Sequence, residues 1–268
     1  MLKPIRVILL FLLMFSMFFG SCGTKKELSI VFLSGANEYF SNYSLTKYKE
    51  YLENHYEGIR ITILNAETEL DKKNFPDLSP LSECDLALFF ARRLTIDGEQ
   101  LDYVKQYVNS GKPIIALRNS SHGFQNWLEF DNKVLGGNYQ GQNEGSQPEP
   151  AALDMDNKRY PAGEAVGPIQ YLEINPQYKN HPLLAGVTDF TSRYSLYKTS
   201  PVASDVQVLL TGTIPEVDKQ PVAWTRDFNG ARVFYVSLGG VQDFENENFI
   251  KMLTNAIFWA SKSEIKLK

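Results

Sequence analysis

Lys112–Phe124 reads KPIIALRNSSHGF, an apolar run that changes abruptly into a polar one. The apolar part, Pro113–Leu117, is typical of a fully buried strand. In an α/β sheet, ligands bind outside the carboxyl ends of the strands. The polar part therefore indicates either a ligand site at the rim of such a sheet or a simple strand-to-helix turn in which Ser120 or Ser121 caps the next helix.

The residues before this stretch alternate between strand and helix patterns. Two apolar runs predict strands at Leu28–Leu33 and Leu86–Phe90, and the alternating segment Ile59–Leu64 predicts a strand near a sheet edge. Apolar residues at helical spacing predict a helix over Ser44–His55, and a capping box predicts a second helix that begins after Asp97. Because strands and helices alternate, we expect a parallel sheet with helices on both of its faces.

The residues after this stretch give a looser pattern. Val134–Gln147 is rich in Gly, Asn and Gln, and it predicts either a mobile insertion or a binding loop. Apolar residues from Phe249 to Ala260 predict a closing helix. Further strands are expected at Ile169–Ile174, Val206–Leu210, Pro221–Thr225 and Arg232–Ser237.

Residues 1–22 are predicted to be a signal peptide that precedes a single domain over residues 23–268. Lys3 and Arg6 give a positive start, Val7–Phe19 is almost wholly apolar, and small residues precede Cys22. This pattern resembles the bacterial lipobox, in which the cysteine becomes the lipidated first residue of the mature chain. The alternative is an uncleaved anchor, although the apolar part is short for a membrane span of roughly 20 residues. We therefore expect a lipid-anchored protein of the cell envelope, at the outer membrane or at the periplasmic face of the inner membrane.

The composition limits the class of partner and the redox chemistry. Of the 268 residues, 43% are hydrophobic, which is enough to bury a full core, and the net charge of −4 argues against nucleic acid as a partner. With Cys22 used by the lipid anchor, Cys84 is the remaining cysteine, so no intrachain disulfide is expected. Cys84 precedes its strand, on the side away from the expected rim, and we interpret it as a buried structural thiol rather than a nucleophile.

Metal and serine-hydrolase chemistry are weakly supported. The three histidines, His55, His122 and His181, do not pair at ligand spacing, so we expect neither a metal nor another cofactor. A serine triad would need Ser120 or Ser121 beside His122, yet neither serine lies in a Gly-x-Ser-x-Gly elbow.

Polar and aromatic side chains follow several predicted strands at their carboxyl ends. Because those ends share one rim in a doubly wound sheet, we expect these side chains to lie close together. Carboxylates accept hydrogen bonds from sugar hydroxyls, Arg donates to them, and Tyr can stack on a ring face, so this rim suits a polyhydroxylated ligand. The alternative is an ordinary solvated rim. The candidate ligand-binding residues are Arg118, Ser120, Arg92, Tyr39, Tyr197 and Asn138.

The candidate catalytic residues are His122, Glu38 and Asp243. His122 is the one histidine expected at the rim, and an imidazole can exchange protons near neutral pH as a general acid or base. Glu38 or Asp243 would be its carboxylate partner, while Arg118 would hold an oxyanion or a hydroxyl group of the ligand.

Several motifs together resemble the ThuA-like family (trehalose-utilisation type) of the class I glutamine amidotransferase-like superfamily. The resemblance extends from Leu28 to Ala260. It implies a flavodoxin-like or class I glutamine amidotransferase-like fold, which is a doubly wound, mostly parallel α/β sheet in a single domain. The motifs are PVAWTRDFNGARVFYVSLGG at Pro221–Gly240, HPLLAGVTDF at His181–Phe190, VLGG at Val134–Gly137, RNSSHGF at Arg118–Phe124, EYFS at Glu38–Ser41 and LYK at Leu196–Lys198.

The chain departs from the family pattern where many members carry histidines. Arg118 stands where many members have His after the central strand, Gly240 stands where many read Leu-Gly-His, and Gln142 follows Gly141 where related members read Gly-His. This chain therefore has fewer histidines than a family site built on several of them. Amidotransferase chemistry is not expected, because the superfamily's nucleophilic cysteine follows the central strand and no cysteine stands there.

What the resemblance implies is a role in sugar metabolism with a small carbohydrate as ligand. Under the first hypothesis the chain is a sugar-processing enzyme, such as a hydrolase or an isomerase. Under the second it is a non-catalytic carbohydrate-binding or scaffold lipoprotein that has lost the family's active-site histidines. The chain could also form a homo-oligomer.

We expect Cys22→Ser to leave an unprocessed precursor, because lipid attachment and cleavage both require the cysteine thiol. Gel mobility and membrane fractionation of the wild-type and variant chains would measure this. A variant that is cleaved and fractionates like the wild type would show that Cys22 is not the anchor.

Overall fold

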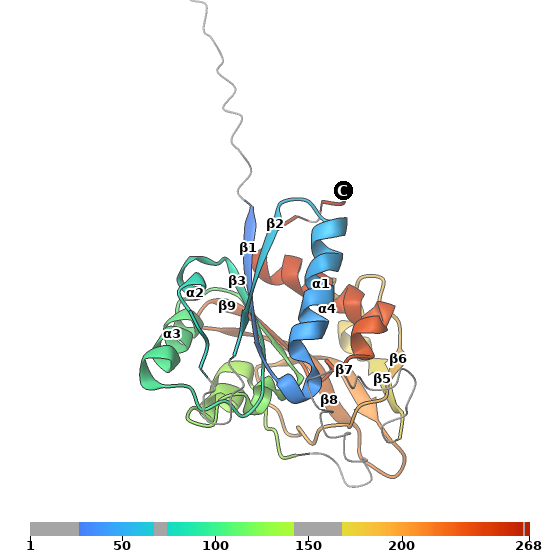
Figure 1. Cartoon of the computed structure of the whole chain (residues 1–268). Coiled ribbons are helices and arrows are strands. Elements are labelled where there is room, and N and C mark those ends of the chain that lie inside the picture. Colours follow the sequence, from blue (N-terminus) through green and yellow to red (C-terminus); the bar gives the residue numbers. More distant parts are fainter. Residues whose placement is uncertain (1–26, 67–73, 142–167, 265) are drawn as a thin grey trace, which may run out of the picture.

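A nine-stranded sheet lies at the centre of the structure (Figure 1). The computed structural model describes residues 27–66, 74–141, 168–264 and 266–268. The strands are adjacent in the order β2-β1-β3-β4-β9-β8-β7-β5-β6. Their bounds are β1 Leu28–Gly35, β2 Ile59–Asn65, β3 Leu86–Ala91, β4 Ile114–Leu117, β5 Gln170–Ile174, β6 Phe190–Ser192, β7 Gln207–Thr213, β8 Gln220–Phe228 and β9 Ala231–Val236.

Helices of very different length connect these strands. The α-helices are α1 Ser41–His55, α2 Pro80–Glu83, α3 Gly98–Asn109 and α4 Glu247–Ser261. The single-turn helices are η1 Asn37–Tyr39, η2 Arg118–His122, η4 Pro176–Tyr178, η5 Pro182–Leu184 and η6 Asp243–Glu245, and η3 Phe130–Leu135 is a π-helix.

The sheet is parallel in its first half and antiparallel in its second. β2, β1, β3, β4 and β9 run parallel to one another, as the alternating strand and helix patterns predict. From β9 to β6 each pair is antiparallel. β8 and β9 are joined by Asn229 and Gly230, whose φ angles of 49° and 81° suit a tight hairpin turn. The α/β class is confirmed, whereas the sequence analysis did not anticipate the antiparallel half.

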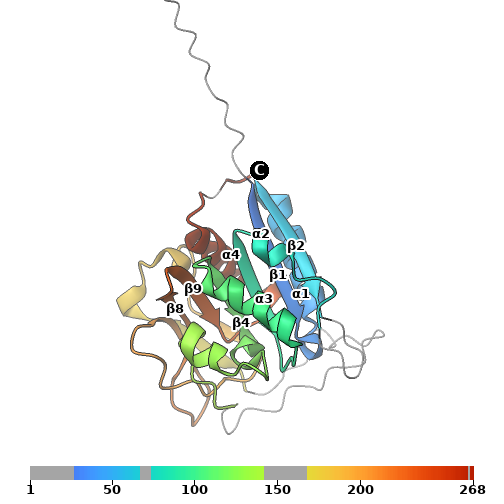
Figure 2. The same cartoon turned by 90° about the vertical axis from the view of Figure 1, so that its left-hand side faces the viewer.

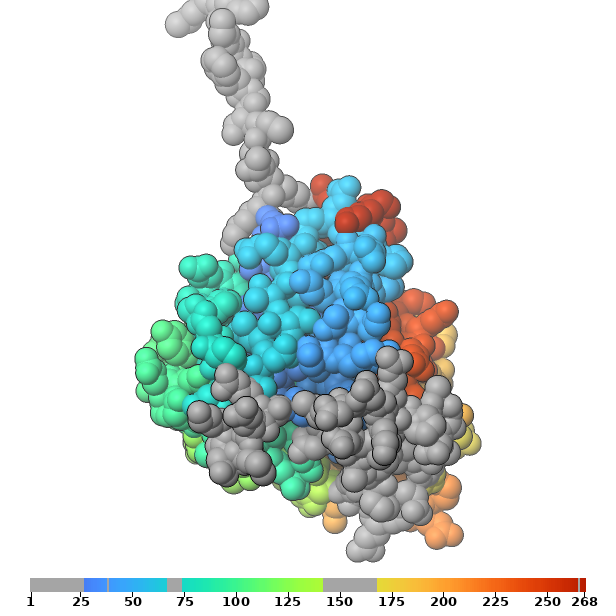
Figure 3. All heavy atoms as spheres, viewed as in Figure 1, coloured from blue at the N-terminus to red at the C-terminus, as the bar shows by residue number. Residues whose placement is uncertain are grey.

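Helices cover both faces of the sheet, as expected. Successive side chains of a strand point to opposite faces, so in β1 Ile30 and Phe32 enter one core while Val31 and Leu33 enter the other. The first core is completed by α1 and α4, and the second by α2 and α3. Figures 1 and 2 show the two helix layers on either side of the sheet, and in Figure 3 the surface of α1 lies beside that of α4.

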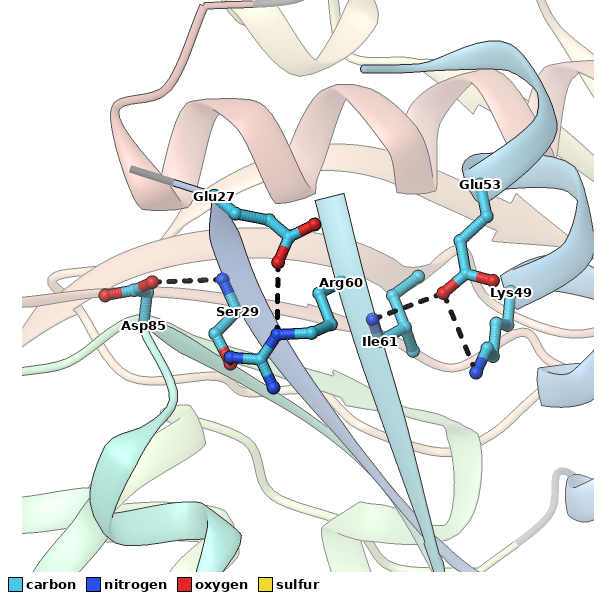
Figure 4. A network of polar contacts seen from close by, with 7 residues as sticks. All are labelled: Glu27, Ser29, Lys49, Glu53, Arg60, Ile61 and Asp85. Atoms are coloured by element: carbon cyan, nitrogen blue, oxygen red, sulfur yellow. Dashed lines mark hydrogen bonds and ion pairs between the residues drawn. The ribbon is translucent and has the colours of Figure 1, made fainter. Parts of the chain in front are cut away.

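Polar contacts fix the amino ends of β1, β2 and β3 (Figure 4). The backbone N–H of Ser29 donates to Asp85 Oδ2 at 3.0 Å, and Arg60 Nε donates to Glu27 Oε2 at 3.1 Å. Cys84 lies at this end of the sheet. It is buried, and burial is the largest cause that raises the pKa of its thiol to about 11. The interpretation of Cys84 as a structural thiol agrees with this environment.

The predicted signal peptide, its predicted anchor Cys22 and the end of the glycine-rich loop from Gln142 onward lie outside the described residues. Within the described residues, no helix is both long and apolar enough to cross a bilayer.

Candidate functional site

The polar residues after β4 form the short helix η2 (Arg118–His122), and all of its side chains are buried. Ser120 Oγ donates to the carbonyl oxygen of Phe89 at 2.8 Å and accepts from the N–H of Ala91 at 3.3 Å. These bonds join the turn to the carboxyl end of β3. Ser120 and Ser121 both lie inside η2, so the interpretation that one of them caps a following helix is wrong. Ser120 is fully buried, which also contradicts a direct contact with a ligand in this conformation.

Arg118 lies beneath the rim rather than on it. Its side chain has 0% exposure, and its Nη1 donates to the carbonyl oxygen of Ser237 at 3.0 Å. The guanidinium carbon lies over the rings of Tyr39, Tyr194 and Tyr197, at 5.1, 5.0 and 5.0 Å from their centroids. The predicted clamp on a ligand oxygen stays a prediction, and from this conformation a ligand would reach Arg118 only if these rings moved. Arg118 supports the aromatic residues of the rim.

The charge of Arg118 is retained in this buried position. Burial lowers the pKa of the guanidinium, but the neighbouring Tyr197, Tyr39, Asp243 and Tyr194 raise it, and the net direction is upward. A buried cation with aromatic rings on several sides is stabilised by their negative faces.

The carboxylate of Asp243 accepts its hydrogen bonds from the turn after β9 and from Ser192, and not from His122. Its Oδ1 accepts from Ser192 Oγ at 2.7 Å, and its Oδ2 accepts from the N–H groups of Gly239 and Gly240, both at 2.9 Å. The hydrogen bonds described for His122 go to other residues, so the predicted pairing of Asp243 with His122 is not formed. Burial raises the pKa of Asp243, although these hydrogen bonds partly counteract that rise.

Glu38 is the other carboxylate predicted to partner His122. Its backbone belongs to η1, at the carboxyl end of β1. Its side chain lies outside the described part of the structure, so its role stays a prediction.

The imidazole of His122 is held on three sides. Nδ1 lies 3.2 Å from Ser121 Oγ, Nε2 lies 3.5 Å from Asn119 Nδ2, and the ring stacks on Tyr139 with centroids 4.1 Å apart at an angle of 17°. Asn119 Nδ2 also donates to the hydroxyl of Tyr197 at 2.9 Å. An amide N–H at Nε2 favours the tautomer that carries its proton on Nδ1.

His122 is neutral at physiological pH. Burial is the largest cause that lowers its pKa to about 3, and the positive charges of Arg92, Arg93 and Arg118 lower it further. A general acid must be protonated at the working pH. The low pKa therefore disfavours the acid half of the predicted role and leaves His122 as a hydrogen-bond partner or a base.

The remaining predicted ligand-binding residues differ in their access to solvent. Tyr197 is fully buried and belongs to the core, and Tyr39 is 8% exposed between the guanidinium groups of Arg92 and Arg118. Arg92 and Asn138 are half-buried and can reach a ligand at the surface.

Sequence reasoning missed Arg93. Its backbone N–H donates to the carbonyl oxygen of His122 at 3.0 Å, so the ends of β3 and β4 are tied together here. Its side chain is exposed, and its φ of 49° is unusual for a residue other than glycine. The doublet Arg92-Arg93 directly after an apolar strand was the available signal.

Asp131 was missed as well. It is 7% exposed within η3, its Oδ2 accepts from the N–H of Tyr139 at 2.7 Å, and burial raises its pKa to about 6. The available signal was weak: an aspartate after an aromatic residue in the segment Phe130–Leu135, directly before Gly136 and Gly137.

The site therefore combines a neutral imidazole, stacked tyrosines and arginines at the carboxyl ends of β3 and β4. Such a group can bind hydroxyl or acidic oxygens and the apolar face of a ring. Among the described residues, no three His, Cys, Asp or Glu side chains are placed to hold a metal ion.

Comparison with known proteins identifies the family model described as ThuA, trehalose utilisation, over residues 30–260. The fold is similar to a ThuA-like protein from Parabacteroides merdae, with 18% identity, a TM-score of 0.64 and coverage of 91% of this chain and 93% of that one. A ThuA-like protein from Bacteroides uniformis is 16% identical, with a TM-score of 0.61 and coverage of 90% and 95%. A β-galactosidase from Bacillus circulans sp. alkalophilus shares the fold at 11% identity and a TM-score of 0.56, over 88% of this chain and 31% of its own. The curated proteins contain no match.

We expect Arg118→Lys to lower the free energy of unfolding by about 1 to 3 kcal/mol, because an ammonium group cannot replace the planar fork and its stacking. Arg60→Lys is the matched control, since Arg60 is exposed and its ion pair with Glu27 lies at the surface. Urea unfolding of both variants measures the difference. An Arg118→Lys variant as stable as the control would show that the rings do not depend on the guanidinium.

We expect the stability of the wild type, relative to Asp131→Asn, to fall as the pH rises from about 4 to about 6. The folded state holds the Asp131 proton more tightly than the unfolded state, so this contribution is complete below the unfolded pKa and is lost through the folded pKa of about 6. The change should approach roughly 2 to 3 kcal/mol.

Urea unfolding at several pH values measures this change. Asp227→Asn, at an exposed position, is the control for the loss of one charge. If the two asparagine variants give parallel pH profiles, the Asp131 carboxyl is not perturbed.

Proposed function

The chain belongs to the ThuA (trehalose utilisation) family, and from this membership we propose that it binds and processes a sugar or sugar derivative at the carboxyl ends of β1, β3 and β4. The observation that carries the proposal is the neutral imidazole of His122, which stacks on Tyr139 beside Arg92 and Arg93. Aromatic faces pack against the C–H face of a sugar ring, and arginine donates to its hydroxyl or acidic oxygens.

In this proposal His122 acts through Nε2, which carries the lone pair when the proton is on Nδ1. With a pKa of about 3 it stays neutral, so Nε2 can accept a hydrogen bond from a sugar hydroxyl in place of the Asn119 N–H, while its low basicity makes it a weak proton acceptor. A complementary acid would have to come from another group, and we propose Glu38, which the sequence predicts as a carboxylate partner of His122. Arg92 and Asn138, both half-buried, would orient the ligand.

Glutamine amidotransferase chemistry is not part of the proposal. The one described cysteine, Cys84, is buried at the opposite end of the sheet, and its pKa is raised to about 11. A thiol in that position cannot serve as a nucleophile at the rim.

A second candidate function is carbohydrate binding without turnover. The low pKa of His122 favours it, because a weakly basic imidazole contributes little to proton transfer. The family histidines replaced by Arg118 and Gly240 favour it too, since both positions now serve packing.

We further propose that the chain is a lipoprotein anchored at Cys22 in the cell envelope. β1 begins at Leu28, at the pole opposite the carboxyl ends that carry the site (Figure 1). An anchor shortly before Leu28 would therefore direct the site away from the membrane. The parallel order β2-β1-β3-β4 supports the further proposal that this half of the sheet has a flavodoxin-like, doubly wound topology.

The test is a panel of mono- and disaccharides and their oxidised or acidic derivatives, scored by thermal shift and by product detection. If the protein is an enzyme, His122→Ala should lower turnover by roughly 100-fold or more. If it is a binding module, the same variant should weaken binding by about fivefold, the value of one hydrogen bond.

His55→Ala is the matched control, since His55 is exposed at the end of α1. It should behave like the wild type in both assays. If no sugar in the panel shifts the melting temperature or is converted, the proposed sugar site is wrong.

A further inference from the structure

Asp131 is a buried carboxylate that neither proposed function uses. It lies at the start of η3, outside the rim, and its backbone carbonyl accepts from the N–H of Gly137 at 3.0 Å. Its side-chain Oδ2 accepts from the N–H of Tyr139 at 2.7 Å. One residue therefore fixes two points of the segment Gly136–Gly141 that carries Tyr139.

Tyr139 in turn covers the imidazole. Its ring stacks on His122 at 4.1 Å and meets the ring of Tyr197 edge-on at 4.8 Å and 62°. His122 retains only 9% exposure. The Tyr139 ring therefore blocks one face of the group on which the proposed function rests.

From this chain of contacts we propose that Asp131 is a positioning residue that holds Tyr139 as a removable cap over His122. The inference rests on the proposed function only in treating His122 as the group that a ligand must reach. A ligand reaches the covered face of the imidazole only when the Tyr139 ring moves away. The hydrogen bond from the Tyr139 N–H to Asp131 therefore sets the fraction of time for which this face of His122 is accessible.

The carboxylate of Asp131 packs directly against the Cα atom of Gly137 and leaves no room for a side chain there. A Cβ atom at this position would lie 2.1 Å from Asp131 Oδ1, far inside van der Waals contact. The carboxylate thus occupies the space that any other residue would fill with its side chain. A larger residue at position 137 would have to displace Asp131 and with it the support of Tyr139.

The second carboxylate oxygen of Asp131 is unusual in its lack of a hydrogen-bond donor. Oδ1 is buried and has no hydrogen-bond partner among the described residues. An acceptor left in this state is destabilising, and buried polar atoms are normally paired. Stability of the fold alone would favour a smaller or neutral residue, which is consistent with a role for Asp131 in holding Tyr139.

Chemical modification of His122 tests the proposal without any sugar. Diethyl pyrocarbonate reacts with neutral imidazole, and His122 is neutral at pH 6 to 7, so its rate reports access to the ring rather than protonation. Trypsin separates the three histidines into peptides 50–60, 119–133 and 180–193, which mass spectrometry can follow individually.

Asp131→Ala should raise the modification rate of His122 by about fivefold, because one hydrogen bond that holds the cap is lost. Gly137→Ala should have a similar effect through the displaced carboxylate. Tyr139→Ala, which removes the cap itself, should raise the rate by at least as much. Asp131→Asn keeps an oxygen acceptor for the Tyr139 N–H and should stay within about twofold of the wild type.

Two controls separate a local effect from unfolding. Gly98→Ala adds a methyl group where nothing lies within 4 Å, and it should leave all three rates unchanged. The rates of His55 and His181 should stay constant in every variant that is still folded by circular dichroism. If Asp131→Ala does not fold, the comparison of Gly137→Ala with Asp131→Asn tests the proposal: the modification rate of His122 should rise in the first variant and stay near the wild-type value in the second.

The proposal is overturned if Asp131→Ala and Gly137→Ala both leave His122 as slow as in the wild type while Tyr139→Ala exposes it. It is equally overturned if Tyr139→Ala has no effect, or if Asp131→Asn is as fast as Asp131→Ala. A protein that binds no sugar would refute the proposed function but would not alter these rates, so the two failures are distinguishable.

Discussion

The buried guanidinium of Arg118 is the constraint on which the candidate site depends. Arg118 follows β4, and its guanidinium donates to the carbonyl of Ser237 after β9. It also lies against three rings from two further segments, Tyr39 after β1 and Tyr194 and Tyr197 between β6 and β7. Removing a cation from water is costly unless hydrogen bonds and favourable charges surround it. The rings and the carbonyl can therefore be displaced only together, which makes the floor of the site one packed unit.

This arrangement explains which parts the sequence could predict. The apolar runs indicate burial on both faces of a parallel sheet, so β1 to β4 were expected, and so were α1 and α3. The short helix α2 was not, because its stretch is polar and contains prolines. The polar run after β4 showed where a rim lies but not which side chains turn inward. Arg118 and Ser120 turn inward because Tyr194, Tyr197 and the end of β3 cover them, and no local pattern reports contacts across about 80 residues.

The lowered pKa of His122 could not be predicted from the sequence either. A free imidazole titrates near neutral pH. Here burial acts first and the neighbouring arginines add to it, so the pKa falls to about 3. Both effects require the three-dimensional arrangement of Arg92, Arg93 and Arg118. Asp131 shows the reverse case, because burial with a single hydrogen bond raises its pKa to about 6. In water an imidazole has a higher pKa than a carboxyl group. In this fold the order is reversed, because the pKa of His122 lies at about 3 and that of Asp131 at about 6.

Two Gly-Gly pairs, Gly136-Gly137 and Gly239-Gly240, each contain one glycine whose missing side chain leaves room for a residue of the site. Gly137 leaves room for the carboxylate of Asp131, which holds Tyr139 over His122. At Gly240 a Cβ would lie 2.0 Å from the ring of Tyr194, which packs on Arg118. Any side chain at position 240, a histidine included, therefore could not coexist with Tyr194 in this position. The glycine at position 240 is thus coupled to the tyrosine at position 194, and through that ring to the buried guanidinium of Arg118.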